Sequence, residues 1–347
     1  MIATDTLDNA AIAELLAREA ENAEGHREMA FKRASREAFL WAEEAADLKA
    51  AGRSLTELDG VGPSIARRIH QWIDSPPEGI EPPELRAEFL TMARARRALD
   101  KQPKWRAQLR GDLQMHTQWS DGSGTVLEMA NEGASRGYEY ISITDHTKGL
   151  KIANGLDEKR LRAQGKEIAK VNRELKTKGV SFTVLRSTEV NLSPSGEVDM
   201  DADALDELDL VLGSFHSALR KTDDQTQRYI AALRNPNLDT LGHPKGRVFN
   251  YRLGLSADWA RVFSEAARLD KAVEIDGYAD RQDLKLSLLK IAKREGCRIS
   301  LGTDAHHPWQ LSYIDLALGA ACLAKIPTDR ILNFLPVHDL KSWAHSH

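Results

Sequence analysis

Residues 111–122 read GDLQMHTQWSDG, a stretch in which polar side chains directly follow a short apolar run. Gln114 and His116 are two residues apart, so both would lie on one face of a strand. Asp121 follows shortly after them. Outward from this stretch, a short apolar run that ends in a histidine or an acidic residue recurs five more times. The residues at these later junctions are His146, Glu189, His216, His243 and the pair Asp304 and His306.

The rest of the chain from Gly111 onward alternates apolar runs with helical stretches of ten or more residues, which is typical of parallel βα units. An open sheet forms a crevice only where its strand order reverses, whereas all strands of a closed barrel end at one mouth. Since six of the seven runs end in polar candidates, we predict the α/β class with a closed seven-stranded barrel. The predicted strands lie near 112–116, 139–145, 182–190, 209–215, 239–243, 272–276 and 297–304.

The converging side chains are imidazoles, carboxylates and one amide, with no thiolate. This donor set suits Zn²⁺, Mn²⁺ or Fe²⁺ and differs from a structural thiolate zinc site. The imidazoles and carboxylates exceed what a single ion can use, so we expect two to three divalent metal ions. Metal ions about 3.5–4 Å apart promote in-line displacement at phosphorus, which predicts phosphoester hydrolysis. The predicted metal ligands are Gln114, His116, Asp121, His146, Glu189, His216, His243, Asp304 and His306, and the predicted catalytic residues among them are His116, Asp121, His146, Glu189, His216 and Asp304.

Two further kinds of side chain are expected near this mouth. Asp145 is a candidate to hydrogen-bond a neighbouring imidazole rather than a metal ion. Cations follow several of the predicted strands, and each could hold a phosphate or be a solvated loop charge. Several cations on one rim favour a phosphorylated substrate. The candidate phosphate-binding residues are Lys148, Lys151, Lys245, Arg247 and Arg281.

The segment from residue 9 to about 100 is rich in Ala, Glu, Leu and Arg, and we predict helices throughout it, including one from about Arg27 to Ala50. A tight turn lies at residues 60–62, and Pro63 suits the first turn of the next helix. Pro and Gly residues between 75 and 83 interrupt the helical pattern. The expected domains are therefore a helical domain over 1–80, a linker over 81–104 and the barrel over 105–347.

The composition is that of a globular protein, with 347 residues, 41% hydrophobic and 29% charged residues. No apolar stretch approaches the roughly 20 residues of a membrane-spanning helix, so no membrane partner is expected. We recognise no secretory signal, and the two cysteines fit a reducing cytoplasm. The net charge of −4 gives no general attraction to nucleic acid, so such a partner would need local basic clusters.

Taken together, the strand-end segments resemble the PHP (polymerase and histidinol phosphatase) domain, in the version found at the C-terminus of bacterial family X DNA polymerases. The likeness runs from about residue 105 to 345. It implies a distorted seven-stranded barrel with up to three metal ions and a manganese-dependent 3′–5′ exonuclease or related end-processing activity. The segments that carry the likeness are GDLQMHTQWSDG at 111–122, ITDH at 143–146, KIANGL at 151–156, STEV at 187–190, GSFH at 213–216, GHPKGR at 242–247 and GTDAH at 302–306.

Residues 9–75 are similar to the small N-terminal helical domain of the same polymerases, including its helix-hairpin-helix. Such a hairpin presents backbone N–H groups to a DNA phosphate without reading the base sequence. The DNA-binding residues that this resemblance implies are Gly60, Val61, Gly62, Arg67 and Arg68.

Two departures from the family pattern narrow the expected activity. About 30 residues separate the hairpin from the barrel, too few for a nucleotidyl-transfer domain, so no polymerase activity is expected. Arg68 stands where the family's lyase domains carry a lysine that forms a Schiff base. A guanidinium stays protonated and is a poor nucleophile, which argues against lyase activity.

Three functions follow as hypotheses. The leading one is a metal-dependent phosphoesterase acting on DNA ends, positioned by the helical domain and involved in DNA repair. The second is a small-molecule phosphatase of the histidinol-phosphate type, whose activity would survive removal of residues 1–100. The third is a non-catalytic DNA-binding protein with a structural metal site, which rests on Gln114 because an amide is a poorer zinc ligand than an imidazole.

Overall fold

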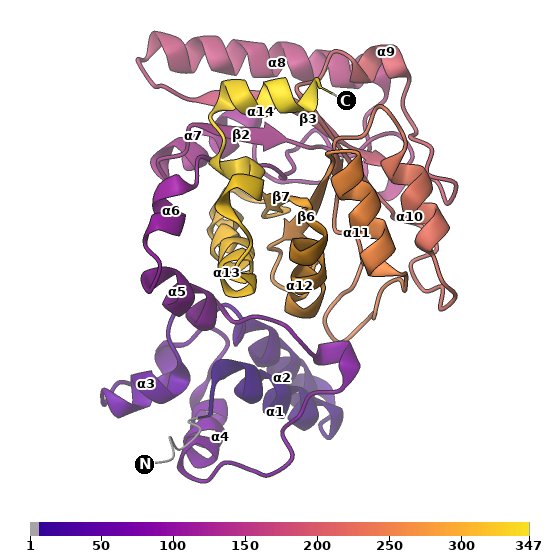
Figure 1. Ribbon diagram of the computed structural model, residues 1–347. Coiled ribbons are helices and arrows are strands. Elements are labelled where there is room, and N and C mark those ends of the chain that lie inside the picture. The colour runs from indigo at the N-terminus through magenta and orange to yellow at the C-terminus, as the bar shows by residue number, and fades with distance from the viewer. Residues whose placement is uncertain (1–6, 347) are drawn as a thin grey trace.

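The computed structural model describes residues 7–346, in which a helical region is joined to a barrel of strands and helices (Figure 1). The seven strands follow one another around the barrel in chain order, and every neighbouring pair is parallel. A parallel bridge between Met115 and Ala305 brings the end of the last strand back beside the first. The predicted seven-stranded barrel is therefore confirmed. The strands are β1 Gly111–Asp112, β2 Tyr140–Ile143, β3 Thr183–Asn191, β4 Leu210–Ser214, β5 Thr240–Leu241, β6 Ala272–Asp276 and β7 Arg298–Gly302.

Helices surround the strands, and local sequence signals set where several of them begin and end. Thr125 and Glu128 form a capping box at the start of α7, and Asp157 accepts a hydrogen bond from the Arg160 N–H at the start of α8. Gly296 ends α12 in the left-handed conformation that glycine adopts without strain. The helices are α7 Val126–Ser135, α8 Glu158–Thr177, α9 Ala202–Leu205, α10 Thr226–Leu233, α11 Trp259–Arg268, α12 Leu286–Glu295, α13 Ile314–Ala324 and α14 Val337–Ala344.

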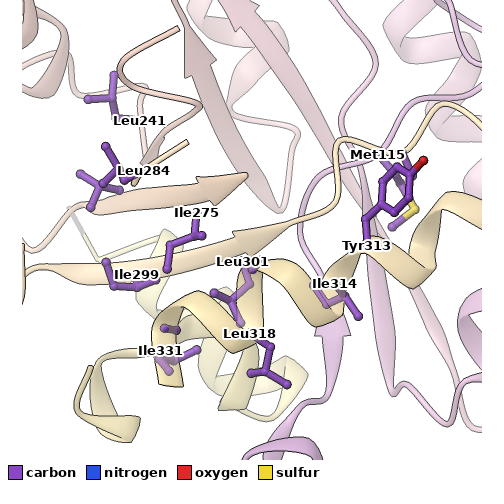
Figure 2. Close-up of a cluster of buried hydrophobic side chains, with 14 of the residues drawn as sticks. Met115, Leu241, Ile275, Leu284, Ile299, Leu301, Tyr313, Ile314, Leu318 and Ile331 are labelled. Carbon is purple, nitrogen blue, oxygen red and sulfur yellow. The ribbon is translucent and has the colours of Figure 1, made fainter. Parts of the chain in front are cut away.

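The main hydrophobic core lies between the strands and these helices. Ile275 and Leu301, from β6 and β7, lie close to Ile314 and Leu318 of α13 (Figure 2). All four side chains are buried. Because this packing holds the strands in place, the polar residues that follow them are carried on a rigid scaffold.

The N-terminal region contains the helices α1 Asn9–Glu21, α2 Gly25–Glu37, α3 Ala45–Ala50 and α4 Pro63–Asp74, with a 3₁₀ turn at Leu55–Glu57. The predicted single helix from Arg27 to Ala50 is wrong, because the chain breaks between α2 and α3. The Asn9 side chain explains the break: its amide donates to the Glu43 carbonyl and accepts from the Ala45 N–H, both at 2.8 Å. A residue from α1 thus replaces the intrahelical partners of this stretch.

The segment predicted as a linker, 81–104, forms the 3₁₀ turn Glu84–Arg86 and the helix α5 Met92–Asp100, and the helix α6 Lys104–Gln108 begins at its last residue. It packs on the barrel, because α5 approaches α13 so closely that a Cβ at Gly319 would lie 2.6 Å from the Ala95 Cβ. The domain boundaries at 80 and 105 stay predictions, and residues 1–6 and 347 lie outside the described part of the chain.

The helical region is attached to the loops that follow β5 and β6. Phe39, Phe89 and Phe249 form a three-ring cluster with centroids 4.9–5.9 Å apart. The buried Arg86 guanidinium pairs with Glu14 of α1 at 2.7 Å and donates to Asn250 of the β5–α11 loop at 2.9 Å. These contacts place the helical region at the carboxyl ends of the strands. No helix within residues 7–346 has the length and apolar character needed to cross a membrane.

Candidate metal centre

The carboxyl ends of the strands bring three overlapping groups of possible ligand atoms together. Within each group the atoms all lie within 4.8 Å of one another. Overlap matters because a side chain shared by two groups can bridge two ions. The groups are His116, Asp121, His146 and His306; His146, Glu189 and His216; and His116, Glu189 and Asp304.

Glu189 of β3 lies at the centre of the cluster. Its Oε1 lies 2.8 Å from His243 Nε2 and 3.3 Å from His216 Nε2, while its Oε2 lies 3.1 Å from His146 Nδ1. Burial alone would raise the pKa of the carboxyl, but the surrounding imidazoles hold that pKa well below its usual range. Glu189 is therefore a buried carboxylate anion in contact with several potential metal ligands.

The other part of the cluster joins β1 to β7. His116 Nε2 lies 2.9 Å from Asp304 Oδ1, and His306 Nε2 lies 3.4 Å from Asp121 Oδ1. Burial would lower the pKa of His116, but the charges of Asp304, Glu189 and Asp121 outweigh it and raise that pKa to about 9. Since a metal ion needs the neutral imidazole, metal binding at His116 displaces a proton. Asp121 is partly exposed and connects the cluster with solvent.

Buried atoms of the cluster that lack a well-aligned hydrogen bond indicate that its side chains can bind divalent cations. Four buried donor or acceptor atoms of the cluster make no well-aligned hydrogen bond within residues 7–346, although two of them, His146 Nδ1 and Glu189 Oε2, lie 3.1 Å apart; the four are His116 Nδ1, His146 Nδ1, His216 Nε2 and Glu189 Oε2. A buried polar atom without a partner costs free energy unless something else satisfies it. The mixture of imidazole nitrogen and carboxylate oxygen suits Zn²⁺, Mn²⁺ or Fe²⁺, so the residues present fit such ions.

Several neighbours hold these side chains in place. His216 Nδ1 lies 3.1 Å from the Asn191 Oδ1, a contact that the sequence did not suggest. Asp145 accepts hydrogen bonds from Thr117 and Ser120 and contacts none of the imidazoles by hydrogen bond. The prediction that Asp145 orients an imidazole is thus wrong, because its two oxygens are used to fix the loop after β1.

Gln114 has a partner that sequence reasoning missed. With its amide oriented by the hydrogen-bond pattern, its nitrogen donates to the Glu274 carboxylate of β6, at 2.9 Å from Oε2. Burial and the nearby Asp276 raise the pKa of Glu274 well above its usual range. Gln114 therefore faces a buried carboxyl group, and its role as a metal ligand stays a prediction. The pair Glu274 and Asp276 shows the same two-residue spacing as Gln114 and His116, and this spacing was the available signal.

The predicted phosphate-binding cations do not share one environment. Arg281 donates to the Asp304 carboxylate at the cluster itself. Lys148 pairs with Glu158 at 2.5 Å, whereas Lys151 is exposed and has no side-chain partner within the described residues. Lys245 donates to the Leu255 carbonyl at 3.1 Å.

Arg247 is the clear exception among these cations. Its buried guanidinium donates to the carbonyls of Ala87, Glu88, Arg281 and Gln282 and lies over the Phe89 ring. The phosphate-binding prediction for Arg247 is therefore wrong, because its donors are used to join the barrel to the segment before α5.

The predicted DNA-binding residues around the hairpin are partly accessible. Gly62 and Arg67 are exposed, and Gly60 is half-buried with a φ of 77°. Val61 is buried and its N–H donates to the Leu58 carbonyl, so it contributes packing rather than a free N–H. Arg68 is half-buried and pairs with Glu19 at 3.1 Å.

Comparisons with known proteins give sequence relatives of the chain and one weakly similar solved structure. No protein-family model matches the chain. It is 34% identical over 237 residues to the DNA polymerase/3′–5′ exonuclease PolX of Bacillus subtilis, spanning 68% of this chain and 41% of that protein. It is 30% identical over 220 residues to a probable phosphatase of Thermoanaerobacter sp., spanning 60% of this chain and 83% of that protein. A histidinol phosphate phosphatase from Lactococcus lactis, solved with zinc, L-histidinol and phosphate, matches with a TM-score of 0.41 and 19% identity over 59% of this chain and 90% of that one. On its strand order, its ligand cluster and its sequence relatives, the chain belongs to the PHP family of metal-dependent phosphoesterases.

Proposed function

We propose that this enzyme hydrolyses phosphodiester or phosphomonoester bonds at DNA ends, as a 3′–5′ exonuclease or related end-processing enzyme of DNA repair. The observation that carries this proposal is the position of the helical region against the β6–α12 loop, which borders the ligand cluster. A crevice of about 100 Å³ separates Arg36 and Leu40 from Tyr278 of the β6–α12 loop. The Tyr278 ring in turn lies 6.0 Å from the His306 ring.

The hairpin is continuous with this crevice. Gly60 packs against Ala34 and Glu37 at the end of α2. Glu37 also lines the crevice. Backbone N–H groups at the start of α4 point away from any intrahelical partner, as at every helix N-terminus, and favour an anion such as a DNA phosphate. A strand bound at the hairpin would therefore be held close to the cluster. The 34% identity to the PolX exonuclease supports the same substrate class.

In this proposal, eight side chains would hold two to three divalent ions: His116, Asp121, His146, Glu189, His216, His243, Asp304 and His306. When bound, such ions supply Lewis acidity and an activated water. The chain's own residues hold the cluster geometry, and Arg281 is placed to neutralise a phosphate oxygen. Because the chain between the hairpin and the barrel has no room for a nucleotidyl-transfer domain, we propose no polymerase activity.

The proposal is tested with end-labelled single-stranded and nicked DNA in the presence of Mn²⁺, Zn²⁺ or Fe²⁺. The expected result is metal-dependent shortening from the 3′ end, which Asp304→Ala abolishes. Absence of cleavage on every DNA, together with turnover of small phosphomonoesters, would overturn it.

A small-molecule phosphatase is the second candidate, and a specific observation favours it. The chain covers 83% of the length of a protein named as a probable phosphatase at 30% identity. Its expected signature is full activity on a phosphomonoester such as p-nitrophenyl phosphate with no dependence on Arg67 or the hairpin. The non-catalytic alternative rested on Gln114, and membership of an enzyme family leaves it without support.

A further inference from the structure

Three arginines lie on loops at the mouth of the barrel, and one of them, Arg281, bonds Asp304 of the ligand cluster. Arg220 lies in the β4–α10 loop, Arg252 in the β5–α11 loop and Arg281 in the β6–α12 loop. These loops follow neighbouring parallel strands, so all three open onto the same mouth. Burial and the positive charges of Arg281 and Arg220 lower the pKa of Arg252. Arg220 is also joined to this loop directly, because its guanidinium lies 4.6 Å from the ring centroid of Tyr251, the residue before Arg252.

Two of these guanidinium groups lack an acidic partner. Arg281 pairs with Asp304, whereas within residues 7–346 neither Arg220 nor Arg252 forms an ion pair with a carboxylate, and Asp283 acts on Arg252 only through its charge. Arg252 donates to the Gly246 carbonyl, and Arg220 lies over the Tyr251 ring at 4.6 Å. Elsewhere exposed arginines commonly pair, as Arg234 does with Glu265 at 2.7 Å. Two neighbouring cations that form no ion pair of their own can bind an anion such as a phosphodiester.

Tyr251 adds an aromatic surface to this cluster. Its side chain is 60% exposed, and the adjoining Leu253 is 43% exposed. A bridge between Val248 and Arg252 makes this part of the β5–α11 loop a tight turn, which fixes the backbone that carries Tyr251. An exposed aromatic ring backed by a guanidinium is a stacking surface for a nucleobase.

We propose that Arg220, Tyr251 and Arg252 form a nucleotide subsite at the rim of the metal mouth. The two guanidinium groups bind the phosphodiester next to the one being hydrolysed. Tyr251 stacks on the base of the nucleotide that lies between these two phosphodiesters. The subsite rests on the proposed function and specifies its substrate as an unpaired DNA strand, because a base in a duplex has no free face for Tyr251. A small phosphomonoester would reach the metal cluster without touching it.

The experiment uses the full chain with Mn²⁺ and three substrates. Bis(p-nitrophenyl) phosphate measures the metal chemistry alone, an end-labelled oligothymidylate supplies bases and phosphates, and an oligonucleotide of the same length with abasic 3′ residues supplies phosphates only. Tyr251→Ala should raise the KM for oligothymidylate about tenfold and leave the abasic substrate and bis(p-nitrophenyl) phosphate unchanged. Tyr251→Phe should behave as the unaltered protein.

A second variant, Arg220→Ala, tests the contact with the phosphodiester separately from the contact with the base. Arg220→Ala should raise the KM for both oligonucleotides and reduce their salt dependence by about one phosphate contact. Val180→Ala, at an exposed apolar residue by the amino-terminal end of β3, is the matched control and should change nothing.

The outcomes separate the subsite from the proposed function. Unaltered oligothymidylate kinetics in Tyr251→Ala, or an equal loss on the abasic substrate, would overturn the subsite while DNA hydrolysis stands. Hydrolysis of bis(p-nitrophenyl) phosphate without cleavage of any oligonucleotide by the unaltered protein would overturn the proposed function and the subsite with it.

Discussion

Glu189 is the side chain on which the geometry of the ligand cluster most depends. It is fully buried and contacts imidazoles that follow four different strands: His116, His146, His216 and His243. A carboxylate at this position compensates the charge of more than one cation and holds the imidazoles together.

Glu189→Gln keeps the shape of the side chain and removes its charge. We expect loss of bound metal and a fall in kcat on bis(p-nitrophenyl) phosphate of about 100-fold or more. Metal content measured by elemental analysis and steady-state kinetics check this. Glu197→Gln, at an exposed carboxylate that bonds Ser195, is the control, and equal activity in the two variants would contradict the role of Glu189.

Gln114→Ala separates a metal ligand from a hydrogen-bond partner. Since the Gln114 amide faces Glu274, its removal should leave metal content unchanged and lower the free energy of unfolding by about 1–3 kcal/mol. Denaturant unfolding and elemental analysis give both numbers, with the exposed Gln118→Ala as control. If Gln114→Ala lost as much metal as Asp304→Ala, Gln114 would be a metal ligand.

At the scale of elements, the loops after β5 and β6 both form the mouth of the barrel and attach the helical region. Their outer residues form the mouth, while Phe249, Asn250 and Arg247 attach the helical region. The position of the helical region is therefore decided by the same loops that shape the site.

Arg247→Met tests this attachment. The variant leaves the carbonyls of Ala87, Glu88 and Gln282 without their donor, so we expect a loss of about 3 kcal/mol in the free energy of unfolding. Limited proteolysis between residues 75 and 88 should also become faster. The exposed Arg294→Met should do neither, and an equally slow proteolysis in both would argue against the attachment.

Lys271, directly before β6, provides a pH-dependent test of core burial. Burial lowers the pKa of its ammonium group to about 8, against about 10.5 in the unfolded chain. Between these values the unfolded state binds more protons, so stability from this group rises with pH. Relative to Lys271→Met, the unaltered protein should gain about 2 kcal/mol from pH 7.5 to 9.5, measured by urea unfolding. A difference that stays constant with pH would contradict the buried charge.

At the scale of the whole molecule, the net charge of −4 means that DNA binding depends on local cations. Arg67 on α4 is exposed next to the hairpin, and no partner for its side chain is found in residues 7–346. Arg68 beside it is already paired with Glu19. Arg67 is therefore the cation best placed to meet a phosphate bound at the hairpin.

Arg67→Glu should weaken binding of labelled DNA and reduce the salt dependence of its affinity by about one phosphate contact, with bis(p-nitrophenyl) phosphate hydrolysis unchanged. Fluorescence anisotropy between 50 and 200 mM salt measures the slope. Arg162→Glu, on α8 and already paired with Glu207, is the control. Unchanged DNA affinity in Arg67→Glu would remove the hairpin from the proposed path of the strand.

The strands and the residues that follow them could be predicted because each is a local pattern. A short apolar run has the length and composition of a strand, and parallel strands joined by helices all end at the same face. For the same reason His146, Glu189 and His216 could be placed at one mouth before any contact was known. The break after α2 could not be predicted, since it depends on Asn9, more than thirty residues away.

The sequence by itself determined the seven-stranded barrel and the donor set at the ends of its strands. Only the tertiary structure decided which partner each of the neighbouring side chains contacts. Closing the ring sets β1 beside β7 and directs Gln114 toward Glu274, and docking of the helical region uses Arg247 while leaving Arg220 and Arg252 without acidic partners. Side chains alternate between the two faces of a strand, so the sequence alone shows which face each one occupies. Which residue it contacts there depends on the distant segment that packs against that face.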